Sequence, residues 1–344
     1  MSTDPRPALT AEDILFVTRE YGLRAPVEHR EFVRGSVRVA KARLRASGRD
    51  WMLKRRPAAE APRLGPVHAF QLHLAHRACP VARPMPNLRG ETVTVGPLGA
   101  FELFPWVEGS RWSGRLEEAA EVGAAVGDML RAAAGFAAPA RKVPAARRPE
   151  AALSLAPAQL AAAALRDDPA VDAAAAEEVA RRVIHRATAA RALAGRAGIT
   201  AAPVSHIHGD IHAGNVRFHE GRLAAVVDFD ECRPGLRAWD IAMAALHFGM
   251  VGSPAEDPPA GGEELRPGHV ISVTMAAANG MDSPLLPEEV RALPWLMIEC
   301  CACEALSTIA RTGRFGAVPA LQMLRFVDRK TDWIESNADR LRLP

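Results

Sequence analysis

Apolar residues change their spacing at Pro105. Before it they fall in short alternating runs broken by Gly, Pro and Ser, a pattern that predicts strands. After it they recur at helical spacing over longer runs, which predicts helices. The predicted strands cover residues 32–34, 37–44, 51–55, 91–95 and 100–104. The predicted helices cover residues 11–21, 68–77, 116–134, 157–165, 173–195, 239–248, 268–279, 287–311 and 316–337.

The first part of the chain is therefore predicted to be an antiparallel sheet that carries one helix between its strands. Ser47-Gly48-Arg49-Asp50 separates two of these strands and is typical of a hairpin turn. With 344 residues, the chain is longer than one compact core usually holds, so two lobes are expected. We assign the fold class α+β, with an N-terminal antiparallel sheet and a larger, mainly helical C-terminal lobe.

Composition and charge narrow the class of protein. Hydrophobic residues make up 49% and charged residues 24% of the chain, as in soluble globular proteins. The formal net charge of +3 is too small to indicate a nucleic acid or an anionic membrane as partner. The N-terminus lacks a signal pattern, and no window reaches the roughly 18 apolar residues of a spanning helix, so a cytoplasmic protein is expected. The oligomeric state stays open.

The five cysteines do not form a disulfide framework, because their number is odd and their spacing is uneven. Cys300, Cys301 and Cys303 lie in an apolar stretch with helical spacing. Adjacent residues of a helix point about 100° apart, so these thiols do not converge as ligands of a zinc ion. We interpret them as buried cysteines of a core helix.

Three oxygen-bearing side chains gather in one compact turn-and-strand unit. Asp210 ends a His-Gly-Asp run, Asn215 closes the loop that follows, and a later apolar strand delivers Asp228 at its exposed end. Two short strands joined by a turn can bring these side chains to one edge of a hairpin. Mg²⁺ prefers carboxylate and amide oxygens, and phosphoryl transfer needs positioning and charge neutralisation more than covalent chemistry. The set therefore suits a phosphotransferase in which one Asp accepts the proton of the attacking hydroxyl.

The run His-Gly-Asp-x-x-x-x-Asn from His208 to Asn215, followed by an apolar strand and Asp228, closely resembles the aminoglycoside phosphotransferase superfamily. That superfamily includes choline kinases, type II homoserine kinases, methylthioribose kinases and bacterial stress-response protein kinases. The likeness continues to Asp240 and covers roughly residues 27–248. Further runs that carry it are Leu53-Lys54-Arg-Arg-Pro57, Cys79-Pro-Val-Ala-Arg-Pro84 and Leu103-Phe-Pro-Trp-Val-Glu-Gly109.

The resemblance implies a bilobal, protein-kinase-like fold and assigns roles to the catalytic segment. The nucleotide-binding lobe would span 1–104, the hinge 105–109, and the helical lobe with the catalytic loop and acceptor site 110–344. Asp210 matches the catalytic base, while Asn215 and Asp228 match the magnesium ligands. Asp240 matches a residue that braces the catalytic loop, and we expect His208 to anchor that loop through hydrogen bonds.

The resemblance also implies where the nucleotide binds. Lys54 matches the lysine that holds the α- and β-phosphates, and the hinge with Phe104 and Trp106 matches the segment that holds the base. Gly35 and Ser36 match the phosphate loop, although only one glycine is present there. The helix glutamate that usually pairs with the strand lysine is not evident. His68 and Gln71 lie where it is expected, and Glu60 is the nearest carboxylate.

The implied function is transfer of the γ-phosphate of ATP or GTP, with Mg²⁺, to a hydroxyl of a small molecule. The acceptor would be an antibiotic such as an aminoglycoside, or a homoserine- or choline-like metabolite. A bacterial stress-response Ser/Thr protein kinase and a non-catalytic nucleotide-binding module are the alternatives. The run from Asp228 to Asp240 is too short for the activation segment of a eukaryotic-type protein kinase, which favours the small molecule. The candidate acceptor residues are acidic and suit a polar acceptor, including a cationic one: Asp230, Glu231, Glu299 and Glu304.

Overall fold

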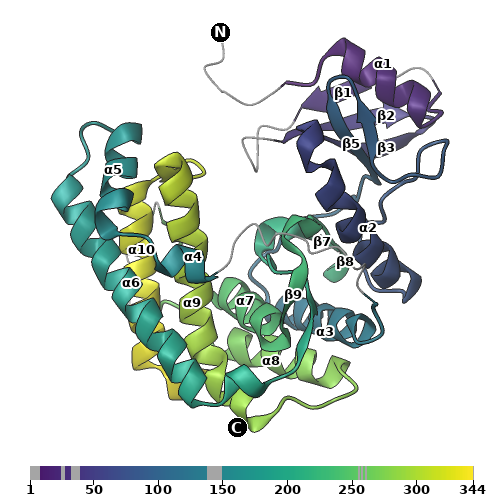
Figure 1. Cartoon of the computed structure of the whole chain (residues 1–344). Helices are drawn as coiled ribbons and strands as arrows, with labels where there is room; N and C mark the ends of the chain where they lie inside the picture. The colour runs from purple at the N-terminus through teal and green to yellow at the C-terminus, as the bar shows by residue number, and fades with distance from the viewer. Residues whose placement is uncertain are drawn as a thin grey trace.

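The computed structural model describes residues 8–24, 28–31, 39–137, 149–254, 256, 259 and 262–343. Figure 1 shows a sheet-bearing N-terminal part at the upper right and a larger helical part below it and to its left. Helix α2 runs from the sheet toward the helical part, so it lies where the two parts meet. The predicted α+β class, with the antiparallel sheet first and the helices after it, is confirmed.

The described residues of the N-terminal part form one sheet and two α-helices. Its five strands are antiparallel neighbours in the order β1-β2-β3-β5-β4. The strands are β1 (Glu28–Glu31), β2 (Ala40–Ala46), β3 (Arg49–Arg56), β4 (Thr94–Gly96) and β5 (Gly99–Pro105). The helices are α1 (Ala11–Glu20) and α2 (Ala61–His76), with the 3₁₀ turn η1 (Ala58–Glu60) before α2.

Strands β2 and β3 form the hairpin that the Ser-Gly-Arg-Asp run predicts. Ser47 and Gly48 are its two turn residues, with φ of +55° and +72°, as a type I′ turn requires. Ala46 pairs with Arg49, and the same register continues along both strands until Lys41 lies opposite Lys54. The turn therefore determines which side chains of the two strands share a face.

Alternation along β2, β3 and β5 gives the sheet one apolar and one charged face. Leu44, Leu53 and Phe101 form a buried cluster with Ile14 and Val17 of α1. The residues that alternate with them point to the opposite face, because successive side chains of a strand alternate. Four charged residues on that face are Lys41, Lys54, Arg56 and Glu102. The N-terminal part thus turns its charged face away from α1.

The C-terminal part contains eight α-helices among the described residues. They are α3 (Leu116–Ala133), α4 (Pro149–Leu153), α5 (Pro157–Asp167), α6 (Ala173–Arg196), α7 (Arg237–Gly249), α8 (Pro267–Gly280), α9 (Pro287–Thr312) and α10 (Ala320–Ser336). Three two-stranded units interrupt them: β6 (Val204–Ile207) with β9 (Arg233–Leu236), β7 (Val216–His219) with β8 (Arg222–Val226), and β10 (Arg314–Phe315) with β11 (Val318–Pro319). The 3₁₀ turns are η2 (Ile199–Ala201), η3 (Ala213–Asn215), η4 (Phe229–Glu231) and η5 (Ala338–Leu341).

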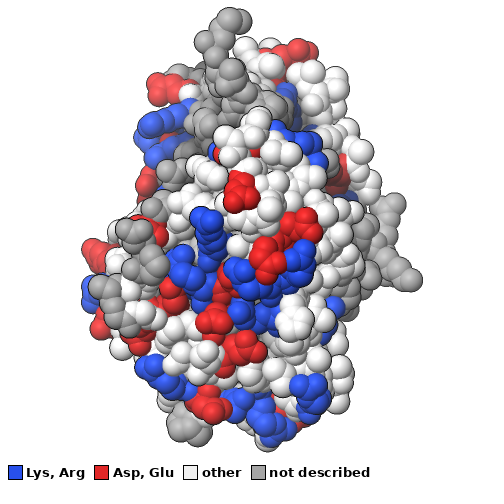
Figure 2. Space-filling model, turned by 90° about the vertical axis from the view of Figure 1, so that its left-hand side faces the viewer, with Lys and Arg blue, Asp and Glu red and all other residues white. Residues whose placement is uncertain are grey.

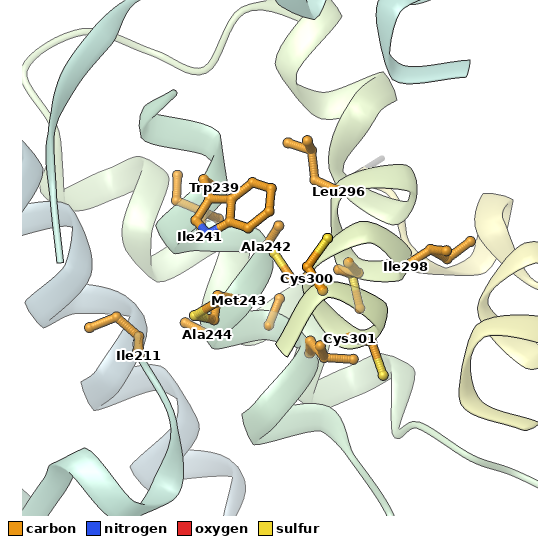
Figure 3. Packing of buried hydrophobic residues seen from close by; sticks show 14 of the residues in the cluster. Ile211, Trp239, Ile241, Ala242, Met243, Ala244, Leu296, Ile298, Cys300 and Cys301 are labelled. Atoms are coloured by element: carbon orange, nitrogen blue, oxygen red, sulfur yellow. The ribbon is translucent and has the colours of Figure 1, made fainter. Parts of the chain in front are cut away.

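Helices α7 and α9 form the centre of the helical core (Figure 3). Ile241 of α7 and Ile298 of α9 are fully buried. Figure 3 shows the sulfurs of Cys300 and Cys301 pointing in different directions, and the five free thiols are all buried. In the described part of the chain no group of three His, Cys, Asp or Glu side chains is suited to a metal ion. The interpretation of these cysteines as core residues is confirmed.

Helix α9 corrects the expectation that no stretch could cross a membrane. By length and composition alone it is long and apolar enough to do so. Of its most apolar window, however, 78% is buried inside the protein, as in the core helix of a soluble protein. The apolar character of α9 is therefore explained by its neighbours α6, α7 and α10.

A few predicted boundaries differ from the structure. Helix α2 begins at Ala61 rather than at residue 68, because Pro62 occupies a first-turn position where its missing N–H costs no hydrogen bond. The strand expected at 91–95 is shorter and lies at Thr94–Gly96. Helix α10 begins at Ala320, after an unexpected hairpin. The strand expected at 32–34 lies outside the described residues.

Basic and acidic side chains are interspersed on the face drawn in Figure 2. Between helices α6 and α10, one basic side chain is surrounded by several acidic ones. Arg186 pairs with Asp328 at 2.8 Å, Asp332 at 2.9 Å and Glu335 at 3.1 Å. The face in Figure 2 thus carries both signs of charge rather than an extended field of one sign.

Replacing Ile298 with Ala is expected to lower the free energy of unfolding by about 2–5 kcal/mol, because it leaves a cavity between packed helices. Urea denaturation followed by far-UV circular dichroism measures this change. Leu165 of α5 is 43% exposed and serves as the control, with an expected change within about 0.5 kcal/mol for Leu165→Ala. Equal losses in the two variants would contradict the placement of Ile298 in the core.

Candidate active site

The catalytic segment lies between two short strand pairs. Strand β6 ends at Ile207, a loop follows to Asn215, and the β7–β8 hairpin returns the chain to Asp228. The backbone N–H of Val227 donates to the carbonyl of Asn215 at 2.8 Å. The end of the loop and the end of the hairpin therefore lie side by side.

Asp240, in the first turn of α7, holds the start of this loop. Its Oδ2 accepts the N–H of His208 at 2.6 Å, and its Oδ1 accepts the N–H of Gly209 at 2.8 Å. Gly209 has φ of +79°, and a Cβ there would lie 2.7 Å from the carbonyl oxygen of Glu231. Burial raises the pKa of Asp240, and the two backbone N–H groups and His208 oppose that shift. The loop thus depends on a buried carboxylate and a glycine.

His208 connects the loop to the end of β8. Its Nδ1 accepts the N–H of Asp210 at 3.2 Å, so its Nε2 carries the proton and donates to the carbonyl of Val227 at 3.2 Å. The side chain is buried, and burial lowers the pKa of His208 below its usual value. A neutral ring with these two bonds anchors the loop, as the sequence leads us to expect.

Asp210 and Asn215 are in direct contact across the loop. The Nδ2 of Asn215 donates to the Asp210 carboxylate at 3.2 Å and to its carbonyl at 2.9 Å. This leaves Oδ1 as the oxygen that Asn215 can offer to a cation. His212 Nε2 lies 3.6 Å from the same Asp210 oxygen, and its Nδ1 accepts the N–H of Gly214 at 3.0 Å. The loop therefore surrounds Asp210 with donors on two sides.

Two lysines of the sheet meet the Asp228 carboxylate. Lys54 Nζ lies 2.8 Å from Oδ1, and Lys41 Nζ lies 2.9 Å from Oδ2. Burial would raise the pKa of Asp228, but Lys54 and Lys41 hold it well below its usual value. Burial would likewise lower the pKa of Lys54, but Asp228 and Asp230 raise it. Asp228 has φ of +67°, a left-handed conformation that costs about 1–3 kcal/mol in a residue with a side chain.

A buried ion network lies beside Lys54 where the helix glutamate was expected. Glu102 of β5 accepts from Arg56 Nε at 2.5 Å, and its other oxygen contacts His68 Nε2 of α2 at 2.9 Å. Burial would raise the pKa of Glu102, but His68 and Arg56 lower it to about 2. Glu60 lies 3.7 Å from Arg56, and Gln71 donates to the carbonyl of Ala82. The buried carboxylate near Lys54 is thus provided by a strand and not by α2.

A cavity of about 370 Å³ lies between the sheet and the catalytic segment. Six of its lining residues are Lys41, Lys54, Phe104, Trp106, Asn215 and Asp228. The segment after Trp106 is joined to β7, because Ser110 and Phe218 exchange two backbone hydrogen bonds of 2.8 and 3.0 Å. Gly109 allows this approach, since a Cβ there would lie 2.5 Å from the carbonyl oxygen of Phe218. Gly35 and Ser36 lie outside the described residues.

A second, small cavity of about 30 Å³ borders Asp210 on the side of the helices. Glu231 and Glu304 line it, together with Trp239 of α7 and Cys300 of α9. Glu304 contacts His247 at 3.0 Å; burial would raise the pKa of Glu304, but His247 lowers it. Two of the four expected acceptor residues therefore lie beside Asp210.

The other two expected acceptor residues have different surroundings. Asp230 lines the large cavity, where Arg56 Nη2 contacts both of its oxygens at 2.6 and 2.7 Å. Glu299 is buried on α9, and Arg191 of α6 lies 2.7 Å from it. Neither residue lines the small cavity. Helical periodicity explains the difference on α9, because residues 299 and 304 point to different neighbours.

The donor set suits a hard cation held jointly with a nucleotide. Asp228 offers a carboxylate and Asn215 an amide oxygen, and both line the cavity that contains the lysines. Mg²⁺ is often bound by one or two carboxylates plus substrate phosphates and water, rather than by a cage of protein ligands. The residues present therefore fit Mg²⁺ together with phosphate, as the sequence leads us to expect.

Sequence reasoning missed three residues of the large cavity and its surroundings. Lys41 could have been found by extending the hairpin register from Ser47-Gly48, which places it opposite Lys54. Arg56 could have been found by strand alternation, because it follows Lys54 by two residues in β3 and therefore points to the same face of the sheet. Glu102 could not be located in this way, because its contact with α2 depends on tertiary packing.

Fold and site together define a kinase-like phosphotransferase. The Phosphotransferase enzyme family matches residues 31–268. The chain therefore belongs to this family and is an enzyme that transfers phosphate to hydroxyl groups. No curated protein matches its sequence significantly.

Solved structures with the same fold are distant in sequence. Amicoumacin kinase in complex with AMP-PNP, Ca²⁺ and Ami has a TM-score of 0.64 and 14% identity, covering 94% of each chain. The microcompartment-associated aminopropanol kinase has a TM-score of 0.63 and 15% identity, covering 97% of this chain and 100% of its own. Choline kinase from Cryptosporidium parvum Iowa II has a TM-score of 0.64 and 10% identity, covering 96% of each chain. These likenesses confirm the expected kinase-like fold.

Changing Asp240 to Asn is expected to loosen the catalytic loop. The amide has one acceptor oxygen and a donor group, so one of the two backbone N–H groups loses its acceptor, at a cost of about 1–3 kcal/mol. Hydrogen exchange at His208 and Gly209 should accelerate roughly tenfold or more, measured by mass spectrometry. Asp282→Asn, at an exposed position, is the control. Unchanged exchange in Asp240→Asn would show that the loop does not depend on this carboxylate.

Proposed function

We propose that this protein transfers the γ-phosphate of ATP or GTP, with Mg²⁺, to a hydroxyl of a small cationic molecule such as an amino alcohol or an aminoglycoside. The observation that carries the proposal is the position of Asp210, which borders the small acidic cavity and contacts Asn215 of the large one. A base at this junction lies between a phosphate donor on one side and a hydroxyl on the other. That is the arrangement that phosphoryl transfer requires.

The large cavity suits a nucleotide because it has lysines at one place for the phosphates and apolar side chains at another for the base. Lys41 and Lys54 provide two ammonium groups for phosphate oxygens, and Lys54 is buried enough for its charge to act in a low dielectric. Phe104 and Trp106 lie at the end of β5, where the proposed hinge 105–109 joins the proposed lobes 1–104 and 110–344. We place the base at this end and the phosphates near Asp228.

Asp228 and Asn215 would hold Mg²⁺, which when bound neutralises phosphate charge. The chain's own residues position the reactants and move the proton. Asp210 accepts the proton of the acceptor hydroxyl at a carboxylate oxygen, and Asn215 keeps that carboxylate in place. Asp240 and His208 keep the loop rigid, so that Asp210 does not need to reorganise during the reaction.

The small cavity favours an acceptor that carries a positive charge and has an oxygen atom near that charge. Among the described residues, Asp210, Glu231 and Glu304 bring three acidic side chains to its lining, and Arg233 brings one guanidinium. Trp239 Nε1 is buried and has no hydrogen-bond partner among the described residues, so it offers a donor to an acceptor oxygen. The cavity is too small for a whole aminoglycoside and fits the reacting end of a ligand.

The names of similar structures agree with this class of acceptor. An amicoumacin kinase, an aminopropanol kinase and a choline kinase share the fold, and these names denote small molecules. The acidic side chains beside Asp210 favour a cationic small molecule, and the Ser/Thr protein kinase is the alternative that the substrate test below addresses. A cytoplasmic location is part of the proposal, since nucleoside triphosphates are its proposed donor.

The proposal is tested by incubating the protein with ATP or GTP, Mg²⁺ and a panel of amino alcohols and aminoglycosides. Mass spectrometry then shows which acceptor gains the mass of a phosphoryl group. Asp210→Asn is expected to lower kcat roughly 10²–10⁴-fold, because the general base is lost. Its Kd for nucleotide should stay unchanged. A variant that keeps more than about a tenth of the parental kcat would remove Asp210 from this role.

Glu304→Gln is expected to raise KM for the acceptor roughly tenfold or more, because a charge-assisted contact becomes a neutral one. KM for the nucleotide should change little, since Glu304 lines only the small cavity of the two. Glu299→Gln is the matched control on the same helix, because its side chain faces Arg191 of α6. Equal effects of the two variants on acceptor KM would contradict the assignment of the small cavity to the acceptor.

A further inference from the structure

Arg56 is a buried cation that the proposed mechanism does not use. Its side chain is 2% exposed, and it is not among the residues that line the large cavity. It nevertheless joins the N-terminal sheet to the segment that carries a metal ligand. We propose that Arg56 is a positioning residue that fixes the metal-binding loop, residues 228–231, against the sheet, an inference that rests on the proposed function.

The contacts of Arg56 join three elements of the structure. Its Nη2 contacts both oxygens of Asp230 at 2.6 and 2.7 Å. Its Nε donates to Glu102 of β5 at 2.5 Å, and Glu102 in turn contacts His68 of α2 at 2.9 Å. One guanidinium therefore connects β3, β5 and, through Glu102, α2 with the metal-binding loop.

The lysines cannot fix this loop during the reaction. Lys41 and Lys54 contact Asp228, and Lys54 also lies 3.5 Å from Asp230, but both lysines are the proposed partners of phosphate. In the proposed function Asp228 would hold the cation and the two lysines would hold the phosphates, so their present ion pairs would be replaced. The contact between Arg56 and Asp230 involves neither the phosphates nor the metal ligands, so it is the ion pair that persists.

The loop needs such an external contact because its own conformation is strained. Asp228 has φ of +67°, which a residue with a side chain adopts only when its surroundings hold it there. On one side Phe229 is buried against His208, with ring centroids 4.4 Å apart. On the other side, toward the sheet, Asp230 is held by Arg56. The two residues after Asp228 thus anchor it between the helical part and the sheet.

Arginine is suited to this role for a geometric reason. Its planar guanidinium can contact Asp230 and Glu102 at the same time, and removal of either carboxylate would leave the buried cation less neutralised. Lysine keeps the charge but presents a single nitrogen, so it cannot satisfy both carboxylates in the same fork geometry. Replacing Arg56 by Lys therefore tests position separately from charge.

The measured quantity is the coupling between cation and nucleotide, which is the Kd of ADP in EDTA divided by its Kd in Mg²⁺. Calorimetric titration of Arg56→Lys should give a coupling roughly tenfold lower than that of the parent, because the loop no longer holds Asp228 in place. Hydrogen exchange of residues 228–231 in the nucleotide-free variant should also be faster. A change in KM without loss of coupling would contradict this role.

Arg55→Lys is the matched control. Arg55 is the neighbouring residue of β3, but it points to the other face of the sheet and contacts Asp13 of α1 at 2.5 Å. A similar loss of thermal stability is expected in both variants, while the coupling of Arg55→Lys should stay within about twofold of the parent. A coupling in Arg56→Lys that equals that of Arg55→Lys would overturn the inference.

Asp230→Asn provides the same test if Arg56→Lys does not fold, because the Asp230 side chain is 21% exposed and tolerates change better than the buried arginine. It should lower the coupling, and where Arg56→Lys does fold, the double variant should be no worse than Asp230→Asn alone. Additive losses would show that the two residues act separately and would contradict the proposal. If the parent itself bound no ADP, the proposed function would fail, whereas normal parental coupling with unaffected variants would refute only the role of Arg56.

Discussion

The attraction between the cations of β2 and β3 and the carboxylates of the loop after β8 holds the cavity in its observed form. Lys41 and Lys54 contact Asp228, and Arg56 contacts Asp230, so strands of one part neutralise acids of the other. These charges are partly buried, which makes their interaction stronger than at a surface and makes an unpaired member costly. In the proposed function no such charge would be left unpaired, because phosphate would replace Asp228 as the partner of the lysines while the cation would pair with Asp228.

The catalytic loop obeys a different constraint, since it is held by backbone hydrogen bonds rather than by ion pairs. Asp240 accepts two N–H groups, and the neutral His208 ring joins the loop to Val227. These contacts are internal to the helical part and involve none of the lysines of the large cavity. Asp210 can therefore keep one position while charges across the cavity exchange partners, which is the kind of preorganisation that favours charge development in a transition state.

The sequence predicted local features better than contacts between distant segments. The turn at Ser47-Gly48 and the helical spacing around Ile298 depend on neighbouring residues, so strands and helices appeared close to their predicted places. The charged contacts Arg56–Asp230 and Glu299–Arg191 join residues far apart in the chain. No spacing rule predicts such pairs. For this reason Asp230 and Glu299 were expected beside Glu231 and Glu304, although the structure places them away from the small cavity.

The buried carboxylate next to Lys54 belongs to Glu102, which pairs with Arg56 and His68, while Lys54 itself pairs with Asp228 and Asp230. In protein kinases an ion pair between a strand lysine and a helix glutamate must be in place, so movement of the helix controls activity. Here the buried carboxylate belongs to β5, the strand next to the one that carries Lys54. Lys54 and Glu102 are paired in register, and sheet hydrogen bonds keep the two strands together whatever position α2 takes. Of the ion pairs of Glu102, a shift of α2 would break only the one with His68, so we expect the lysine in this protein to be positioned by the sheet and not by a mobile helix.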